Sequence, residues 1–213
     1  MDLFAAHEPP SRTPLGPQAC VLHGYALAQA DALLAGIDAV AAAAPFRHPV
    51  TPGGHVMQVA MTNCGAHGWT SDRRGYRYDR TDPQSGLGWP AMPDDFRALA
   101  AAAAREAGFD AYVPDACLVN RYAAGTRLSL HQDRDEDDAT APIVSVSLGL
   151  PATFLFGGLA RGDRPVRLAL WHGDVVVWGG VDRMRFHGVL PVRPGIHPAT
   201  GAARLNLTFR KVK

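Results

Sequence analysis

Cysteine is scarce in this chain, and its three copies, Cys20, Cys64 and Cys117, lie far apart. An odd number without a CxxC pair or a regular spacing indicates reduced thiols and a cytoplasmic protein. The first residues, MDLFAAHEPPSRTP, contain an acid and several prolines but no apolar core typical of a secretory signal. No apolar run is long enough to cross a bilayer, so we expect no membrane partner.

An excess of charge of one sign is also missing. The 213 residues contain 21 Lys and Arg against 20 Asp and Glu, a formal net charge of +1. The whole-molecule field therefore gives no case for nucleic-acid binding, and any basic surface must be local. Hydrophobic residues make up 47% of the chain, which argues against disorder, and the length fits one domain with a sizeable core.

Helical periodicity is confined to two segments. Apolar residues recur at helical spacing over residues 27–44, and Pro45 ends that pattern. Asp94 and Asp95 open a second helix, where acidic side chains suit the helix dipole, and Gly108 ends it.

The segments around the first helix have little periodicity. Residues 1–19 are rich in proline and predict an extended arm. Residues 46–92 are rich in Gly, Pro, Asp and Arg, and a loop-rich insert of this length is usually functional. We therefore describe residues 1–213 as a single domain with an N-terminal arm and helix (1–45), an insert (46–92) and a core (115–213).

The sequence pattern changes from Cys117 onward, where short β-like runs are separated by Gly, Pro and Asp. The eight runs are CLVNRY, RLSLH, PIVSVSLGL, TFLFGG, VRLALW, DVVVWGG, FHGVLPV and RLNLTFR. Eight short strands with two helices predict a mainly β protein with flanking helices. The expected fold is the double-stranded β-helix, the cupin-like jelly roll.

One of these runs, RLSLH, continues into the stretch SLHQDRDEDD. In an extended strand, His131 and Asp133 of this stretch lie on the same face. A third metal ligand must come from elsewhere. His187 begins a strand and is a plausible partner, His197 lies in a turn, and His172 belongs to a second HxD, in WHGD, that we interpret as a turn. Two histidines and a carboxylate with open coordination positions are typical of non-haem Fe(II) oxygenases. The alternative is that these are ordinary polar strand residues.

The C-terminal strand ARLNLTFRKV carries polar side chains at alternate positions: Arg204, Asn206, Thr208 and Arg210. If that face points inward, the two arginines need anionic partners, and a small dicarboxylate would provide them. The same parity places Asn120 and Tyr122 on one face. The alternative is a solvated edge strand with exposed arginines.

The stretch WTSDRRGYRYDR supplies a local basic patch. It interleaves Trp69, Tyr76 and Tyr78 with Arg73, Arg74, Arg77 and Arg80. Aromatic side chains stack on bases and arginines contact phosphates, so the stretch favours nucleic acid. The alternative is an ordinary surface loop.

Together these motifs resemble the AlkB family of Fe(II)/2-oxoglutarate-dependent dioxygenases, and most closely its bacterial members. The likeness lies in Asn120-x-Tyr122, His131-x-Asp133, His187 and Arg204-x5-Arg210, and it extends from about residue 60 to the end. It implies that residues 46–92 form a nucleotide-recognition lid. It also implies oxidative demethylation of 1-methyladenine and 3-methylcytosine in DNA, with RNA as a further candidate. The cosubstrates would be 2-oxoglutarate and O₂, and the products succinate, CO₂ and formaldehyde.

The resemblance also implies residue roles. His131, Asp133 and His187 would bind Fe(II), as the catalytic residues. Arg204, Tyr122 and Asn120 would hold the distal carboxylate of 2-oxoglutarate, with Arg210 and Asn206 near its 2-oxo acid end. The expected substrate contacts are Trp69, Tyr76, Arg77, Tyr78, Asp135 and Arg161.

The acidic residues after the metal motif have two different expected roles. Asp135 would favour a base made cationic by methylation. Glu136, Asp137 and Asp138 are expected to form a solvated turn.

Other functions stay open at this point. The expected partner is single-stranded or locally opened nucleic acid bound by a monomer. One rival is an oxygenase of the same fold that hydroxylates a protein or a small molecule, and another is a cupin-like binding module without turnover. Succinate formation would exclude the second rival.

Overall fold

Both predicted helices are present in the computed structural model, which describes residues 11–213. A short 3-10 turn at Leu27–Gln29 leads into α1 (Ala30–Ala43), and α2 spans Asp94–Glu106. The boundaries lie close to those expected. No helix within residues 11–213 is long and apolar enough to cross a membrane.

All eight strands predicted after Cys117 are also present. They are β6 (Ala116–Tyr122), β7 (Leu128–His131), β8 (Ile143–Gly149), β9 (Ala152–Phe156), β10 (Val166–Leu170), β11 (Val175–Trp178), β12 (His187–Val189) and β13 (Arg204–Arg210). They divide between a seven-stranded major sheet, in the order β1-β2-β11-β8-β13-β6-β3, and a four-stranded minor sheet, in the order β10-β9-β12-β7. The double-stranded β-helix prediction is confirmed.

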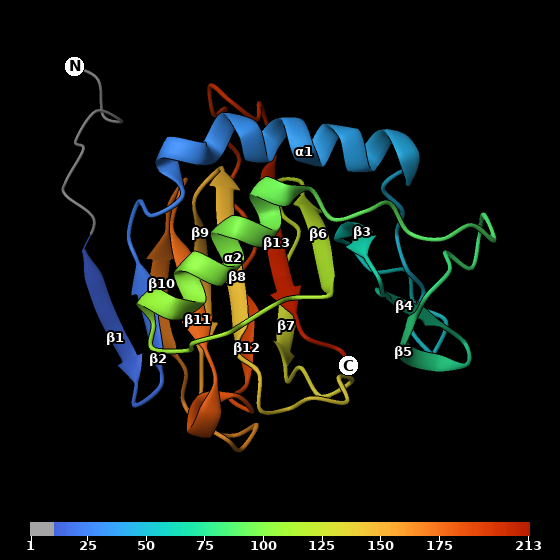
Figure 1. Ribbon diagram of the computed structural model, residues 1–213. Coiled ribbons are helices and arrows are strands. Elements are labelled where there is room, and N and C mark those ends of the chain that lie inside the picture. Colours follow the sequence, from blue (N-terminus) through green and yellow to red (C-terminus); the bar gives the residue numbers. More distant parts are fainter. Residues whose placement is uncertain (1–10) are drawn as a thin grey trace.

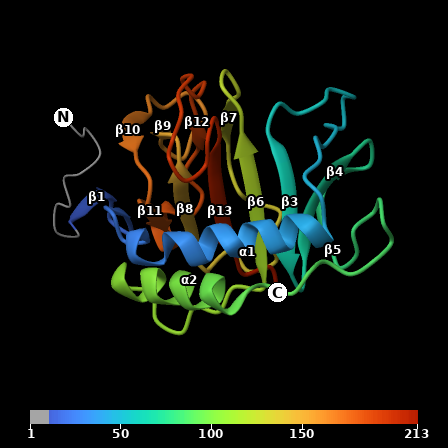
Figure 2. The same ribbon diagram turned by 90° about the horizontal axis from the view of Figure 1, so that it is seen from above.

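The layers follow from the alternation of side chains in the major sheet. Val175 and Val177 of β11 pack in a core cluster with the inner residues of both helices, such as Leu33 and Phe96. The alternate residues Val176 and Trp178 face the minor sheet, where Trp178 meets aromatic side chains of β9. Both helices therefore cover one face of the major sheet, and the minor sheet covers the other (Figures 1 and 2).

The N-terminal segment differs from the predicted arm. Residues Arg12–Gly16 form β1 and Ala19–Leu22 form β2, and β2 pairs with β11 inside the major sheet. The prolines obscured this hairpin in the sequence, because proline is tolerated in an edge strand such as β1. The part of the predicted arm in residues 1–10 lies outside the described residues.

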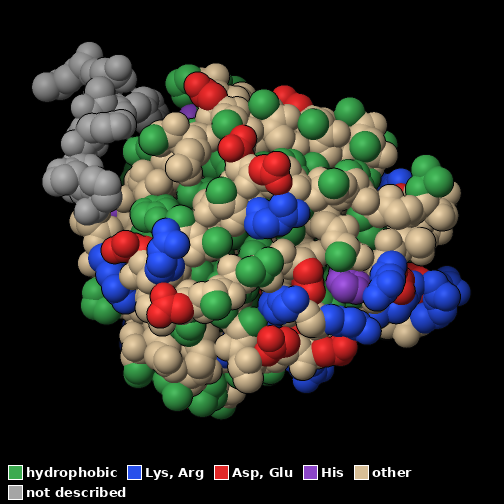
Figure 3. Space-filling model, viewed as in Figure 1, with side chains coloured by type: hydrophobic (Ala, Val, Ile, Leu, Met, Phe, Trp, Pro, Cys, Tyr) green, Lys and Arg blue, Asp and Glu red, His purple; other side chains and the backbone are tan. Residues whose placement is uncertain are grey.

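The insert of residues 46–92 contains three strands. Ala60–Gly65 forms β3, the edge strand that pairs with β6, and so belongs to the major sheet. Gly68–Asp72 and Gly75–Asp79 form β4 and β5, a separate hairpin beside the sheet (Figure 1). Lys and Arg side chains gather on that side of the molecule, whereas charges are scattered over the helix-bearing face (Figure 3).

Candidate metal centre and substrate cavity

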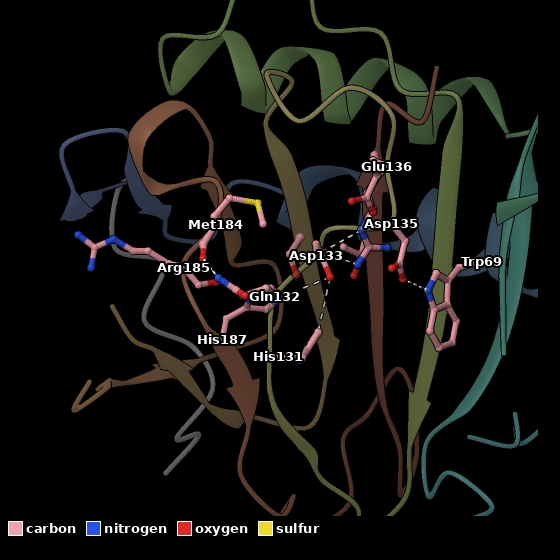
Figure 4. Close-up of polar contacts among 12 residues, drawn as sticks. Trp69, His131, Gln132, Asp133, Asp135, Glu136, Met184, Arg185 and His187 are labelled. Atoms are coloured by element: carbon pink, nitrogen blue, oxygen red, sulfur yellow. Dashed lines mark hydrogen bonds and ion pairs between the residues drawn. The ribbon is translucent and has the colours of Figure 1, made fainter. Parts of the chain in front are cut away.

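Three predicted ligands meet where β7 and β12 lie side by side. His131 ends β7 and pairs in register with His187 at the start of β12, and their ring centroids are 4.3 Å apart. Asp133 follows two residues later, so that one donor atom from each of the three residues lies within 4.8 Å of the other two. Figure 4 shows the three side chains converging from neighbouring segments.

Backbone carbonyls fix the tautomers of the two histidines. Nδ1 of His131 lies 2.9 Å from the carbonyl oxygen of Ser129, and Nδ1 of His187 lies 3.1 Å from that of Arg185. A carbonyl only accepts, so each Nδ1 donates its proton and each Nε2 keeps a free lone pair. Burial, with His131 beside it, lowers the pKa of His187 to about 3. The imidazole is therefore neutral at pH 7, as a metal ligand must be.

The carboxylate of Asp133 is divided between two tasks. Its Oδ2 accepts hydrogen bonds from Nε of Arg210 at 2.9 Å and from Nη2 at 2.6 Å. Its Oδ1 faces Nε2 of His131 at 3.6 Å and Nε2 of His187 at 3.8 Å. Burial opposes the charge, but Arg210 and the two histidines lower the pKa of Asp133 below its ordinary value. One oxygen is thus held by the protein and the other is free for a metal.

This donor set fits Fe(II). Two neutral imidazoles and one carboxylate oxygen form the facial arrangement that non-haem Fe(II) oxygenases use, with the remaining positions open. The open side faces a cavity of about 1050 Å³. That volume exceeds what one small molecule needs, so a cosubstrate and a nucleobase could occupy it together.

Strand β13 forms the floor of this cavity with its alternate residues. The polar residues Arg204, Asn206, Thr208 and Arg210 line the cavity, whereas Leu207 and Phe209 pack on the helix side of the sheet. The neighbouring strand β6 adds two further lining residues, Asn120 and Tyr122. The structure therefore brings together all five side chains predicted to bind the cosubstrate, although their roles remain predictions.

Arg204 is buried with unused donors. Its Nη2 donates to Ser147 Oγ at 3.0 Å, but Nε and Nη1 have no protein partner. Its guanidinium lies 4.9 Å from the ring centre of Tyr122, and burial lowers its pKa. A buried guanidinium with unpaired N–H groups is costly unless an anion completes it. The site thus fits the carboxylate of a small dicarboxylate such as 2-oxoglutarate.

The β4–β5 hairpin borders the same cavity with aromatic side chains. Trp69 and Tyr76 are stacked, with ring centroids 5.6 Å apart, and both line the cavity. Trp69 Nε1 donates to Asp135 Oδ2 at 3.0 Å (Figure 4). Tyr76 is 48% exposed, which leaves its ring accessible to a ligand.

Two further residues of the hairpin are tied to acidic neighbours. Arg77 forms ion pairs with Asp72 at 3.0 Å and with Asp79 at 2.8 Å, so its guanidinium is already neutralised within the hairpin. Tyr78 donates its hydroxyl proton to Glu136 Oε1 at 2.7 Å. A direct substrate contact by either residue remains a prediction.

The expectation for the acidic run is wrong for Glu136. Its side chain is only 2% exposed and forms ion pairs with Arg183 and Arg210. The Asp137 side chain is 70% exposed, and Asp138 accepts two hydrogen bonds from Thr140 in a local turn, as expected. Sequence reasoning missed both Glu136 and Arg183, because nothing in the stretch VDRMRF distinguishes Arg183 from a surface arginine.

Arg161 lies at the rim of the cavity. Its Nη1 donates to the carbonyl oxygen of Leu130 at 2.8 Å, and its guanidinium lies 4.9 Å from the ring centre of Phe186. Sequence reasoning missed other lining residues from the irregular segment before β3, among them Thr51, His55 and Met57.

Comparison with known proteins agrees with this geometry. Residues 18–210 match the family model of the 2OG-Fe(II) oxygenase superfamily. The chain is 56% identical over 211 residues to the alpha-ketoglutarate-dependent dioxygenase AlkB of Escherichia coli, covering 99% of this chain and 97% of that protein.

More distant relatives extend the likeness. A protein of Arabidopsis thaliana named DNA N(6)-methyladenine demethylase ALKBH1C is 35% identical, over 63% of this chain and 35% of its own length. The solved structure of OsALKBH1 superposes with a TM-score of 0.81 at 29% identity, covering 94% of this chain and all of that one.

Proposed function

Because this chain belongs to the AlkB family of the 2OG-Fe(II) oxygenase superfamily, we propose that it is an oxidative demethylase of alkylated bases in nucleic acid. The reaction consumes 2-oxoglutarate, O₂ and an N-methylated base, and it yields succinate, CO₂, formaldehyde and the unmodified base. The preferred lesions are 1-methyladenine and 3-methylcytosine. The observation that carries the proposal is the stacked Trp69–Tyr76 pair on the same cavity as the metal ligands.

The metal ligands in this proposal are His131, Asp133 and His187. Bound Fe(II), with 2-oxoglutarate, supplies the activation of O₂ that oxidises the methyl C–H bond. Arg210 keeps the second oxygen of Asp133 occupied, so that the carboxylate offers a single oxygen to the metal. The carbonyl oxygens of Ser129 and Arg185 keep both imidazoles in the ligating tautomer.

The cosubstrate lies along β13 and β6 in this proposal. Arg204 holds the distal carboxylate through its two unpaired nitrogens, with Tyr122 and Asn120 beside it. Arg210 and Asn206 lie near the 2-oxo acid end. A planar guanidinium binds a carboxylate in two-point fashion, which fixes the orientation of the cosubstrate relative to the metal.

The methylated base enters under the β4–β5 hairpin. Trp69 and Tyr76 stack on its face, Asp135 favours the positive charge of the methylated ring, and Arg161 at the rim contacts the backbone. Arg77 and Tyr78 contribute by shaping the hairpin. The base must leave its stack to reach this depth, so the substrate is single-stranded or locally opened. A monomer that works in the cytoplasm completes the proposal.

A methylated oligonucleotide tests this function directly. The protein is incubated with Fe(II), 2-oxoglutarate and O₂, and mass spectrometry follows the loss of one methylene unit from an oligonucleotide that carries a single 1-methyladenine. The expected result is demethylation with one succinate formed for each methyl group removed. A different outcome favours a hydroxylase of a protein or a small molecule. In that case succinate forms, the oligonucleotide does not stimulate its formation, and the oligonucleotide keeps its methyl group.

A further inference from the structure

The side chain of Glu136 is buried between the exposed residues Asp135 and Asp137. Its Oε1 accepts the hydroxyl proton of Tyr78 at 2.7 Å and lies 3.2 Å from Nε of Arg210. Its Oε2 accepts a hydrogen bond from Nη2 of Arg183 at 3.0 Å. Two hydrogen-bond donors and the guanidinium of Arg210, from distant parts of the chain, thus converge on one carboxylate.

The two arginines on Glu136 both also hold Asp133. Arg210 donates to the Asp133 carboxylate, and Arg183 donates from Nη1 to the Asp133 carbonyl oxygen at 2.6 Å. Two carboxylates and two guanidiniums form a buried group without net charge. Because a buried charge needs its partner, Glu136 determines where both arginines lie, and through them where the metal ligand lies.

The other side of Glu136 leads to the β4–β5 hairpin. Trp69 donates to Asp135 and Tyr78 donates to Glu136, so the hairpin is fastened through two aromatic side chains to two consecutive carboxylates. Trp69 and Tyr76 also line the cavity in which the proposed base would bind. One carboxylate therefore lies between the hairpin that contacts the base and the arginine beside the metal and cosubstrate.

We propose that Glu136 is a positioning residue that joins the β4–β5 hairpin and the Arg210–Asp133 pair into one unit, so that base binding and cosubstrate binding strengthen each other. This inference rests on the proposed function. A base stacked on Trp69 favours the hairpin arrangement in which Tyr78 reaches Glu136. A cosubstrate beside Arg210 favours the arrangement in which Arg210 keeps its contact with Glu136. Two ligands that favour one arrangement raise each other's affinity by the same factor.

Binding measurements without turnover test the coupling. The dissociation constant of 2-oxoglutarate is measured by calorimetry with Mn(II) in place of Fe(II), under nitrogen, with and without a 1-methyladenine oligonucleotide. The coupling ratio is the dissociation constant of 2-oxoglutarate without the oligonucleotide divided by the value with it. In the unmodified protein this ratio is expected to be about five or more, the ordinary size of such couplings. In Tyr78→Phe, which keeps the ring and removes only the hydroxyl, the coupling ratio falls to near one.

Glu136→Gln removes the charge but keeps the shape of the side chain, and it is also expected to bring the coupling ratio near one. Asp137→Asn is the matched control, because it removes the neighbouring charge from a side chain that is 70% exposed. It should keep the ratio of the unmodified protein. If Glu136→Gln does not fold, Tyr78→Phe decides the question alone.

The outcomes separate three cases. If Glu136 has a merely structural role, the variants bind each ligand more weakly but keep the coupling ratio of the unmodified protein. That result overturns the inference. A ratio near one in the unmodified protein, with both ligands bound, also overturns it while the proposed function stands. Failure of the unmodified protein to bind 2-oxoglutarate or the oligonucleotide contradicts the proposed function itself.

Discussion

The chain contains two HxD sequences, His131-Gln132-Asp133 and His172-Gly173-Asp174, and only the first is built into a metal site. In the second, Gly173 has a φ of 89°, and the amide of Asp174 donates to the carbonyl oxygen of Trp171 in a turn. A side chain at position 173 would collide with Leu27. Two residues that share a face in an extended strand therefore do not share one here.

The Asp174 carboxylate and one ring nitrogen of His172 are already occupied in the second motif. The Asp174 carboxylate accepts hydrogen bonds from the amides of Gly24 at 2.9 Å and Trp171 at 2.8 Å, and Nδ1 of His172 accepts one from the amide of Gly149 at 2.9 Å. In the first motif, Asp133 Oδ1 and two imidazole Nε2 atoms face one another without such partners. An HxD pair indicates a metal only where the surrounding backbone leaves its donors free.

The largest expected contrast is between the two aspartates. Asp133→Ala removes the only carboxylate of the ligand set, and we expect turnover and iron content to fall below detection while the protein stays folded. Asp174→Ala should retain iron but lose stability by about 1–3 kcal/mol, because it leaves two amides without their acceptor. Iron analysis, demethylation assays and denaturant unfolding measure these effects. Retained demethylation with normal iron content in Asp133→Ala would refute the metal assignment.

Two candidate ligands outside β7, His187 and His172, sharpen the same contrast. We expect His187→Ala to lose iron, because the imidazole opposite His131 is gone, and His172→Ala to keep it. His172 lies beside His197, with ring centroids 4.6 Å apart, yet the metal cluster among residues 11–213 consists of His131, Asp133 and His187. Iron content of the two purified variants decides the matter. An empty site in His172→Ala with a full one in His187→Ala would mean that the wrong motif was chosen.

Arginines offer a contrast of intermediate size. Arg204→Ala should raise the 2-oxoglutarate KM by about 10-fold or more, since a hydrogen bond to a charged group contributes roughly 1.5–3 kcal/mol. The KM for the oligonucleotide should change little. Arg121 on the neighbouring strand β6 is the control, because it is exposed and stacks on Phe46 away from the cavity. Equal cosubstrate KM values for Arg204→Ala and Arg121→Ala would assign the carboxylate to another residue.

The sequence predicted best those features that depend on local periodicity. Alternation correctly placed the polar face of β13, and the eight strands followed from short apolar runs between Gly, Pro and Asp. The first helix followed from apolar residues at helical spacing, and the second from its acidic start and Gly108. The β1–β2 hairpin was missed because its prolines suggested an arm, although edge strands accept them. The segment 46–92 concealed β3, whose partner β6 lies more than fifty residues away.

Glu136 shows the same limit inside the site. Its neighbours Asp135 and Asp137 are exposed, and its own sequence context is that of a solvated turn. Only the fold brings its two arginine partners to Glu136. Arg183 lies 47 residues away in the sequence, and Arg210 belongs to the last strand, β13. Burial of a charged side chain by distant partners leaves no periodic signal in the sequence.

The smallest expected effect separates charge from shape at Asp135. Asp135→Asn keeps the shape and an oxygen that can still accept from Trp69 Nε1, but it removes the negative charge. We therefore expect a loss in kcat/KM for the cationic lesions 1-methyladenine and 3-methylcytosine, and little change for the neutral lesion 3-methylthymine. Trp69→Ala is the comparison. It should weaken the binding of every lesion by about 1–3 kcal/mol, because each base has a face to stack on. The measurement is kcat/KM for matched oligonucleotides with one lesion each. Equal losses for cationic and neutral lesions in Asp135→Asn would show that its carboxylate serves only to hold Trp69, and that lesion charge is not sensed at this position.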